Sequence, residues 1–197
     1  MITQGHGVQI HQRGVVLVSS LLLLLVVTIM ALSMFRSFGI QEKIAGNMRE
    51  KQRALAAAES AQEFAEQWLI ANSTAAPVAC STLISGNNGL GQICSNKLPT
   101  VVLNVASVPW QIAGANVGVT YVPPGMNVVA AGSVPTINSY YDKPTFYISD
   151  AGASADPNVP GEIFQIDAVG YGGNLNTAAV VESTYAVYSS SSNRGGP

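Results

Sequence analysis

The stretch that decides the fold is VVLVSSLLLLLVVTIMALSMF, residues 15–35. It carries no charge over its 21 positions, and Arg36 ends it. At about 1.5 Å of rise per residue, a helix of this length spans a hydrocarbon layer about 30 Å thick. We therefore predict a membrane-spanning helix over residues 15–35. A secretory signal peptide has a shorter apolar core followed by a cleavage site of small residues, and that pattern does not fit here.

A helical pattern continues beyond Arg36. The segment RALAAAESAQEFAEQWL consists of strong helix formers, and charged residues of both signs lie between the apolar ones as a predicted solvated face. Asn72, Ser73 and Pro77 supply the predicted end of the helix. Residues 36–70 are therefore predicted to form the amphipathic half of the same helix. Its apolar stripe is Ile40, Ile44, Met48, Leu55, Ala58, Ala61 or Ala65, and Trp68.

Residues 71–188 have the short alternating runs and turn clusters of a β-rich exported domain. We expect a small antiparallel sheet packed on the C-terminal half of the helix, covering the stripe from Leu55 to Trp68. The predicted fold class is α+β. The tail at 189–197 is of low complexity and is predicted to be flexible. The predicted strands lie at 100–105, 108–112, 117–122, 145–148, 162–169 and 178–188.

Two strands have a clear periodicity. In the fifth, Phe164, Ile166 and Ala168 alternate with Gln165 and Asp167, so the first three are predicted to face the core. In the last, the predicted core-facing residues are Val181, Tyr185 and Val187.

The chain has two cysteines, Cys80 and Cys94. In an exported protein an isolated pair is most simply a disulfide, which here would contribute roughly 3 kcal/mol by restricting the unfolded chain. The alternative, two free thiols, fits only a reducing compartment.

The composition argues against two classes of function. Only 10% of residues are charged and the formal net charge is −2, which disfavours nucleic acid as a partner. Both histidines, His6 and His11, precede the apolar run. If the leader is removed, no histidine remains for a catalytic triad or a His-based zinc site. We therefore expect neither an enzyme nor a cofactor.

The N-terminal region resembles that of PilX-type minor pilins of type IV pili. The resemblance lies in the basic residue and Gly14 directly before the apolar run, then in Ile44-Ala45-Gly46-Asn47 with Arg49, and in Ala57-Ala58-Glu59. It covers about residues 13–70. The C-terminal VGYGGNLNTAAVVESTYAVY also resembles the closing hairpin of that family, loosely over 162–188.

The resemblance implies a pilin-like fold and a life cycle. Residues 1–14 would be a prepilin leader that prepilin peptidase removes between Gly14 and Val15, and Val15 would then be N-methylated. The helix would hold the subunit in the inner membrane with its C-terminal domain in the periplasm, and would pack in the fibre core after assembly. Implied partners are other minor pilins, the major pilin and a PilY-type tip adhesin.

One position departs from the family pattern. Major pilins carry a glutamate five residues into the mature chain, where this sequence has Ser19. In pilins that carboxylate is thought to meet the amine of the subunit ahead. A subunit without it suits the position that has none ahead, the pilus tip, as in the K-type minor pseudopilins of type II secretion. The alternative is that Ser19 merely bonds within its own helix.

Two weaker motifs remain open. Asp150, Asp156, Glu162 and Asp167 gather oxygen ligands of the kind that calcium binds, but their spacing matches no EF-hand. Asn72-Ser73-Thr74 matches a glycosylation acceptor, a motif with many false positives.

The leading functional prediction is a minor pilin that primes pilus assembly at the tip and helps to present an adhesin. A type II secretion minor pseudopilin is the alternative within the same machinery. A permanently anchored periplasmic binding domain is the alternative of another class, and it would keep its N-terminus uncleaved.

Overall fold

A computed structural model describes residues 13–98, 108–130, 133, 136–155 and 161–188. The predicted leader, the predicted strand at 100–105 and the predicted tail therefore fall wholly or largely outside the described residues. The chain divides into two compact units, with the boundary between Asn47 and Met48. Each unit is described by itself below.

Helix α1 (Arg13–Asn72) runs through 60 residues and contributes to both units. The sequence predicted this helix over 15–70, so its existence and its end are confirmed. At the C-terminus the side-chain amide of Asn72 donates to the carbonyl oxygen of Trp68 at 2.8 Å. The carbonyl oxygen of Asn72, one of those that a helix end leaves without a helical partner, accepts from the backbone N–H of Ala75 at 2.9 Å.

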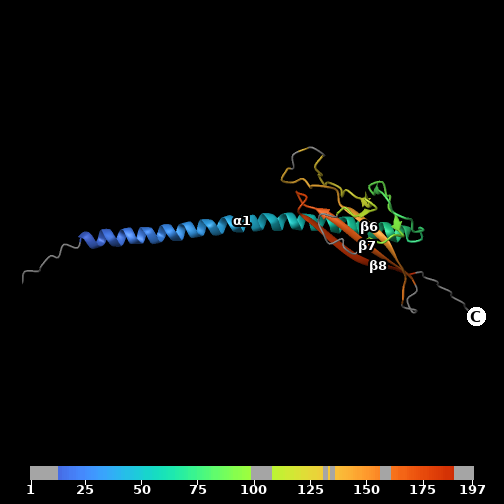
Figure 1. Ribbon diagram of the computed structural model, residues 1–197, viewed down its shortest axis with the longest axis horizontal. Helices are drawn as coiled ribbons and strands as arrows, with labels where there is room; N and C mark the ends of the chain where they lie inside the picture. The colour runs from blue at the N-terminus through green and yellow to red at the C-terminus, as the bar shows by residue number, and fades with distance from the viewer. Residues whose placement is uncertain (1–12, 99–107, 131–132, 134–135, 156–160, 189–197) are drawn as a thin grey trace, which may run out of the picture. The chain divides into compact units, whose positions relative to one another are not determined.

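The second unit contains a six-stranded sheet beside the C-terminal part of α1 (Figure 1). Its main path runs in the order β1-β5-β6-β7-β8, and β2 also pairs with β6. The strands are β1 (Leu83–Ser85), β2 (Ile93–Cys94), β5 (Gly118–Thr120), β6 (Thr145–Ala153), β7 (Gly161–Tyr171) and β8 (Ala178–Tyr188). A separate two-stranded sheet is formed by β3 (Gln111–Ile112) and β4 (Ala115–Asn116).

The long strands agree with the predicted ones and the short strands do not. β8 has the predicted bounds, and β7 and β6 begin within one residue of theirs. The runs predicted at 108–112 and 117–122 shrink to β3 and β5, while β1, β2 and β4 were not predicted. The sheet is also not wholly antiparallel, because β1 pairs with β5 and β2 with β6 in parallel. Strands of two or three residues are too short to show a periodicity.

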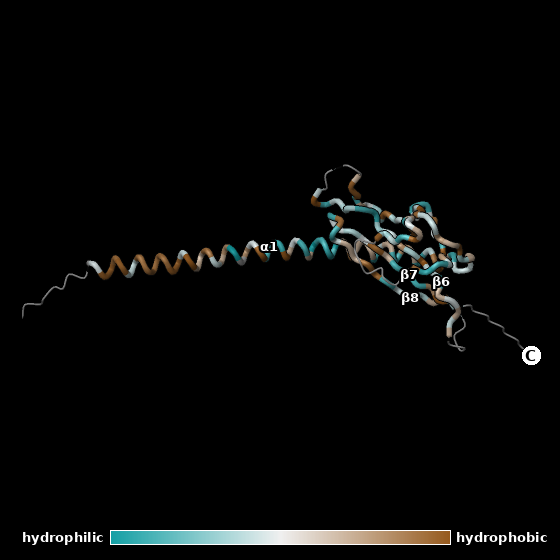
Figure 2. The backbone as a smooth tube through the Cα atoms, viewed as in Figure 1, coloured by the Kyte–Doolittle hydropathy of each residue, from teal (hydrophilic) through white to brown (hydrophobic). Residues whose placement is uncertain are grey.

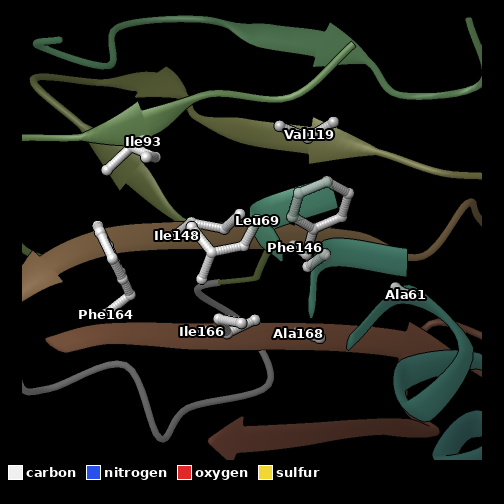
Figure 3. Packing of buried hydrophobic residues seen from close by; sticks show 10 residues of the cluster. Ala61, Leu69, Ile93, Val119, Phe146, Ile148, Phe164, Ile166 and Ala168 are labelled. Carbon is white, nitrogen blue, oxygen red and sulfur yellow. The ribbon is translucent and has the colours of Figure 1, made fainter. Parts of the chain in front are cut away.

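One face of the sheet packs on α1 and forms the first core. Figure 3 shows Phe146 and Ile148 of β6 and Phe164, Ile166 and Ala168 of β7 with Ala61 and Leu69 of the helix. The predicted core-facing residues of β8, Val181, Tyr185 and Val187, pack at its margin. The predicted core faces of β7 and β8 are thus confirmed.

The helix meets the sheet through alanine rather than through leucine. Leu55, predicted to be covered, is 40% exposed, and the buried positions of α1 are Ala54, Ala57, Ala58, Ala61, Ala65 and Leu69. Gly170 of β7 explains the choice. A β-carbon at Gly170 would collide with backbone atoms of Ala54, Ala57 and Ala58. Near Gly170 the backbones approach so closely that only small side chains fit between them, whereas Leu69 is buried further along the helix.

The opposite face of the sheet carries a second core. Tyr147, Val169 and Tyr171 pack there with Trp110, and with Cys80 and Cys94. The two cysteines form a disulfide with a Cα–Cα distance of 5.3 Å. The bond therefore holds the segment after the helix against this face. Both sulfur-bearing residues are buried.

Asp167 lies on this second face, opposite the predicted core face of β7. Asp167 is nevertheless only 7% exposed, because this face carries the second core. The pKa of Asp167 is raised to about 6, mainly by burial and in smaller part by the negative charge of Glu182 on β8. Hydrogen bonds from the Gln165 amide act in the opposite direction.

Replacing Gly170 with alanine should destabilise the second unit. The added methyl group meets backbone that cannot move without displacing α1, so we expect a loss of about 1–3 kcal/mol or more. Denaturant unfolding of the detergent-solubilised chain measures it. Gly46→Ala is the control, because no atom lies within 4 Å of its β-carbon position and the change should stabilise the helix by up to about 1 kcal/mol. Equal stability of the two variants would contradict the close contact.

Replacing Asp167 with asparagine should stabilise the protein at neutral pH. The folded-state pKa of about 6 exceeds the ordinary 3.8, so ionisation penalises the native state increasingly between those values. The variant should exceed the parent by up to about 3 kcal/mol above pH 6, with no difference below about pH 3.8. Thermal unfolding from pH 3.5 to 8 checks this. In Glu182→Gln the pH window of the penalty should move downward, and a pH-independent difference would contradict the assignment.

Candidate functional site

The first part of α1 is apolar on every side, as the continuous hydrophobic colour in Figure 2 shows. Val15 is 73% exposed, and the large apolar side chains from Val16 to Phe35 are likewise exposed. Among the described residues α1 is the one helix long and apolar enough to cross a membrane. A helix that is hydrophobic all round requires lipid or other apolar helices as its surroundings.

Gly14, Val15 and Ser19 lie in the first two turns of this helix. The hydroxyl of Ser19 donates to the carbonyl oxygen of Val16 at 3.0 Å. Ser20 and Thr28 bond in the same way to Leu17 and Leu25. Each polar group is satisfied within its own helix, as an apolar environment demands. A glutamate at position 19 would instead need a charged partner from another chain.

A second group of polar contacts ties α1 to two loops of the second unit. The Arg53 guanidinium pairs with Glu50 at 2.9 Å and donates to the carbonyl oxygen of Ser139 at 2.8 Å. It also lies 4.4 Å from the centre of the Tyr140 ring. The Glu50 carboxylate accepts a hydrogen bond from the backbone N–H of Gly173 at 2.5 Å. These contacts hold the 137–140 segment and the β7–β8 connection against the helix.

Burial acts to raise the pKa of Glu50, but the hydrogen bond from Gly173 and the bond and charge of Arg53 outweigh it and lower the pKa. Glu50 therefore stabilises the native state above the ordinary carboxyl pKa, and this contribution is lost as the pH falls through the lowered value. The sequence suggested only a solvated charged face here. The sequence could not predict these contacts, because it does not indicate which flank of the helix the two loops cover.

The remaining acidic motif forms no metal site in the part of the chain that the structure describes. Asp150 accepts a hydrogen bond from the N–H of Gly152, and Asp167 lies three residue pairs further along the β6–β7 ladder. Asp156 is outside the described residues. Among the residues that the structure describes, no group of three acidic, histidine or cysteine side chains could hold a metal ion. Asn72 of the glycosylation motif ends α1 and bonds to Trp68.

Comparison with known proteins agrees with the helix. Residues 13–63 match the family model described as PilX N-terminal. The match includes Gly14, Val15 and Ser19, together with the Glu50–Arg53 pair. No curated protein and no solved structure matches the chain.

The matched family is one of structural, non-enzymatic pilins. Its N-terminal apolar helix is consistent with a membrane-anchored prepilin, and membership implies assembly with other pilins. The α+β arrangement of a long helix on a mostly antiparallel sheet is pilin-like. Residues 13–63 therefore carry a PilX N-terminal domain, the N-terminal domain of a family of type IV pilins.

Proposed function

We propose that this minor pilin primes type IV pilus assembly and occupies the pilus tip or a position near it. There it contacts other minor pilins, the major pilin below and a PilY-type tip adhesin. The observation that carries the proposal is Ser19, whose hydroxyl bonds to Val16 within the same helix. The side chains in the first turns of the mature helix therefore carry no negative charge that must meet the amine of a subunit ahead.

The proposal gives each part of the chain one task. Residues 1–14 are the leader, removed by prepilin peptidase between Gly14 and Val15, after which Val15 is N-methylated. Residues 15–35 anchor the subunit in the inner membrane and later pack in the fibre core. Residues 36–70 support the exported domain of 71–188, and 189–197 are its tail. The unbroken apolar surface of α1 supports both roles of residues 15–35, because lipid and neighbouring helices are equally apolar.

The disulfide between Cys80 and Cys94 supports an exported domain, since such bonds persist in oxidising compartments. It also supports periplasmic maturation before the subunit joins the fibre. A type II secretion pseudopilin would share all these features, so the location of the mature protein separates the two functions. A permanently anchored domain would share the disulfide but would keep its first fourteen residues.

Replacement of Gly14 by a bulkier residue such as leucine should block processing. The mature N-terminus is measured by mass spectrometry, separately in membranes and in sheared surface fibres. We expect N-methylated Val15 in the fibres of the parent strain, and intact Met1 confined to membranes in the variant. Intact Met1 in the parent would leave an anchored periplasmic domain. Mature protein secreted or retained without surface pili would indicate the pseudopilin.

Ser19→Glu tests the tip position. A carboxylate at this place allows the subunit to meet the amine of one ahead of it, so labelled protein should spread from the fibre ends along the shaft. Ser20→Glu, one residue further round the helix, is the matched control and should not enter the shaft. Fluorescence or gold labelling of the exported domain locates the subunit. The same end-restricted label in parent and Ser19→Glu would remove positional meaning from Ser19.

A further inference from the structure

The two outer strands of the main sheet path differ in length and protection. β1, at one end of the path, has three residues, and such short edges offer little to pair with. β8, at the other end, has 11 residues and pairs with β7 alone among the described residues. Figure 1 shows β8 as the outer strand beside β7. Its ladder with β7 runs without a register shift.

β8 lacks the features that normally keep an edge strand from pairing. Its sequence AAVVESTYAVY contains no proline and no lysine, and Glu182 is its single charged residue. Natural edges are usually shortened, bulged, charged or covered. An unbulged edge of this length is therefore a template for an added strand.

The pairing of β8 with β7 determines which backbone N–H and C=O groups of β8 are free to bond with an added strand. The carbonyl oxygen of Gly161 accepts from the N–H of Ser154, so Gly161 directs its backbone groups toward β6. Its β8 partner Tyr188 consequently belongs to a pair without hydrogen bonds. Because the two kinds of pair alternate, the even-numbered residues from Ala178 to Tyr188 direct their N–H and C=O groups outward.

A groove follows this edge on the side of α1. Its volume is 470 Å³, and it is lined by Met48, Lys51, Gln52, Leu55 and the start of β8 at Ala178, Ala179 and Val180. Met48 is 58% exposed and Leu55 40%. These are the apolar side chains that the close contact at Gly170 displaces to the helix flank.

The middle of the edge is acidic on both faces. Glu66 accepts a hydrogen bond from Ser183 of β8 at 3.2 Å, and Glu59 precedes it by two turns on the same flank of α1. Glu182 lies on the other face of the sheet, beside Asp167. An added strand would place alternate side chains over each face, with an apolar residue over the groove and basic residues near Glu66 and Glu182.

We infer that β8 is a strand-accepting surface for an extended, basic segment of another protein, which lengthens the sheet and places an apolar side chain against Met48 and Leu55. A second copy of this chain does not fit, because none of the described strands contains lysine or arginine. This mode of recognition takes its affinity from main-chain hydrogen bonds and its specificity from the alternate side chains. It stands apart from leader cleavage and tip position, so either can fail without the other.

The test uses the full chain in nanodiscs and a labelled 11-residue peptide, with valine at every second position and threonine and lysine between. A second peptide carries glutamate in place of lysine. Fluorescence anisotropy should show that the lysine peptide binds and that the glutamate peptide binds about tenfold more weakly, which corresponds to about 1.4 kcal/mol. Equal binding of both peptides, or no binding of either, would overturn the inference.

Thr184→Pro removes an outward N–H and should weaken the lysine peptide about tenfold, whereas Thr184→Ala keeps that N–H and should leave binding nearly unchanged. Glu182→Lys should reverse the preference between the two peptides. Glu63→Lys makes the same charge change on the exposed face of α1 and should not. If Glu182→Lys and Glu63→Lys weakened binding of the lysine peptide equally, the peptide would be attracted by net charge alone. That result would contradict a site at β8.

Amide hydrogen exchange can be measured on the unaltered chain, so its result does not depend on whether a variant folds. The lysine peptide should slow exchange of the Val180, Glu182 and Thr184 amides, while the inward-facing Val181 and Ser183 amides are already protected by β7. Unchanged exchange at the even-numbered residues would exclude strand addition. Sedimentation that shows a dimer lost in Thr184→Pro would identify a second copy as the occupant and would overturn the proposed partner.

Discussion

One contact determines how helix and sheet pack in the second unit. Gly170 of β7 lies against the backbone of α1 at Ala54, Ala57 and Ala58. Because helix and strand touch through backbone there, only small side chains fit between them, and the helix face that meets the sheet is a stripe of alanines that ends at Leu69. Larger residues of α1 pack where the surfaces diverge. Phe64 stacks on Tyr121 with 4.3 Å between ring centroids, and Trp68 donates from its indole nitrogen to the Gly89 carbonyl oxygen at 3.1 Å.

The contact at Gly170 is also related to the positions of the charged residues Glu50 and Arg53 and to the groove beside β8. Gly170 is followed closely by Gly172 and Gly173, and the N–H of Gly173 reaches the Glu50 carboxylate one helical turn before Ala54. Arg53 continues this connection to the Ser139 carbonyl oxygen. On the opposite flank, Leu55 and Met48 project past the last strand and remain partly uncovered. Tight packing at the centre of the helix thus leaves apolar side chains beside an unpaired strand.

The first unit follows a different constraint. Its helix has no covering layer, so its polar groups must be satisfied locally, and Ser19, Ser20 and Thr28 do so through carbonyl groups three residues earlier. Hydroxyls of this kind are compatible with lipid and with a bundle of helices alike. The match of residues 13–63 to the PilX N-terminal domain agrees with a helix of this kind. The second unit contains two hydrophobic cores and a disulfide.

The sequence alone determined the elements whose signal is local and long. An uncharged run of 21 residues and a continuing helical period predict α1, and alternation over many residues predicts β6, β7 and β8. Cys80 and Cys94 are paired as the cysteine count suggested. The position of Gly14 before the apolar run, and Ser19 within it, were likewise readable, because these features depend on order along the chain.

Tertiary structure decided everything that depends on what covers a surface. Asp167 alternates with the residues of the predicted core face, yet it is buried on the other face of the sheet, and this burial raises its pKa. Leu55 belongs to an apolar helical stripe, yet Gly170 brings the sheet so close that alanine occupies the contact instead. The parallel strands β1 and β2 have two or three residues and exist only through β5 and β6. Periodicity reports which residues share a face, whereas burial depends on segments distant in sequence that pack against that face.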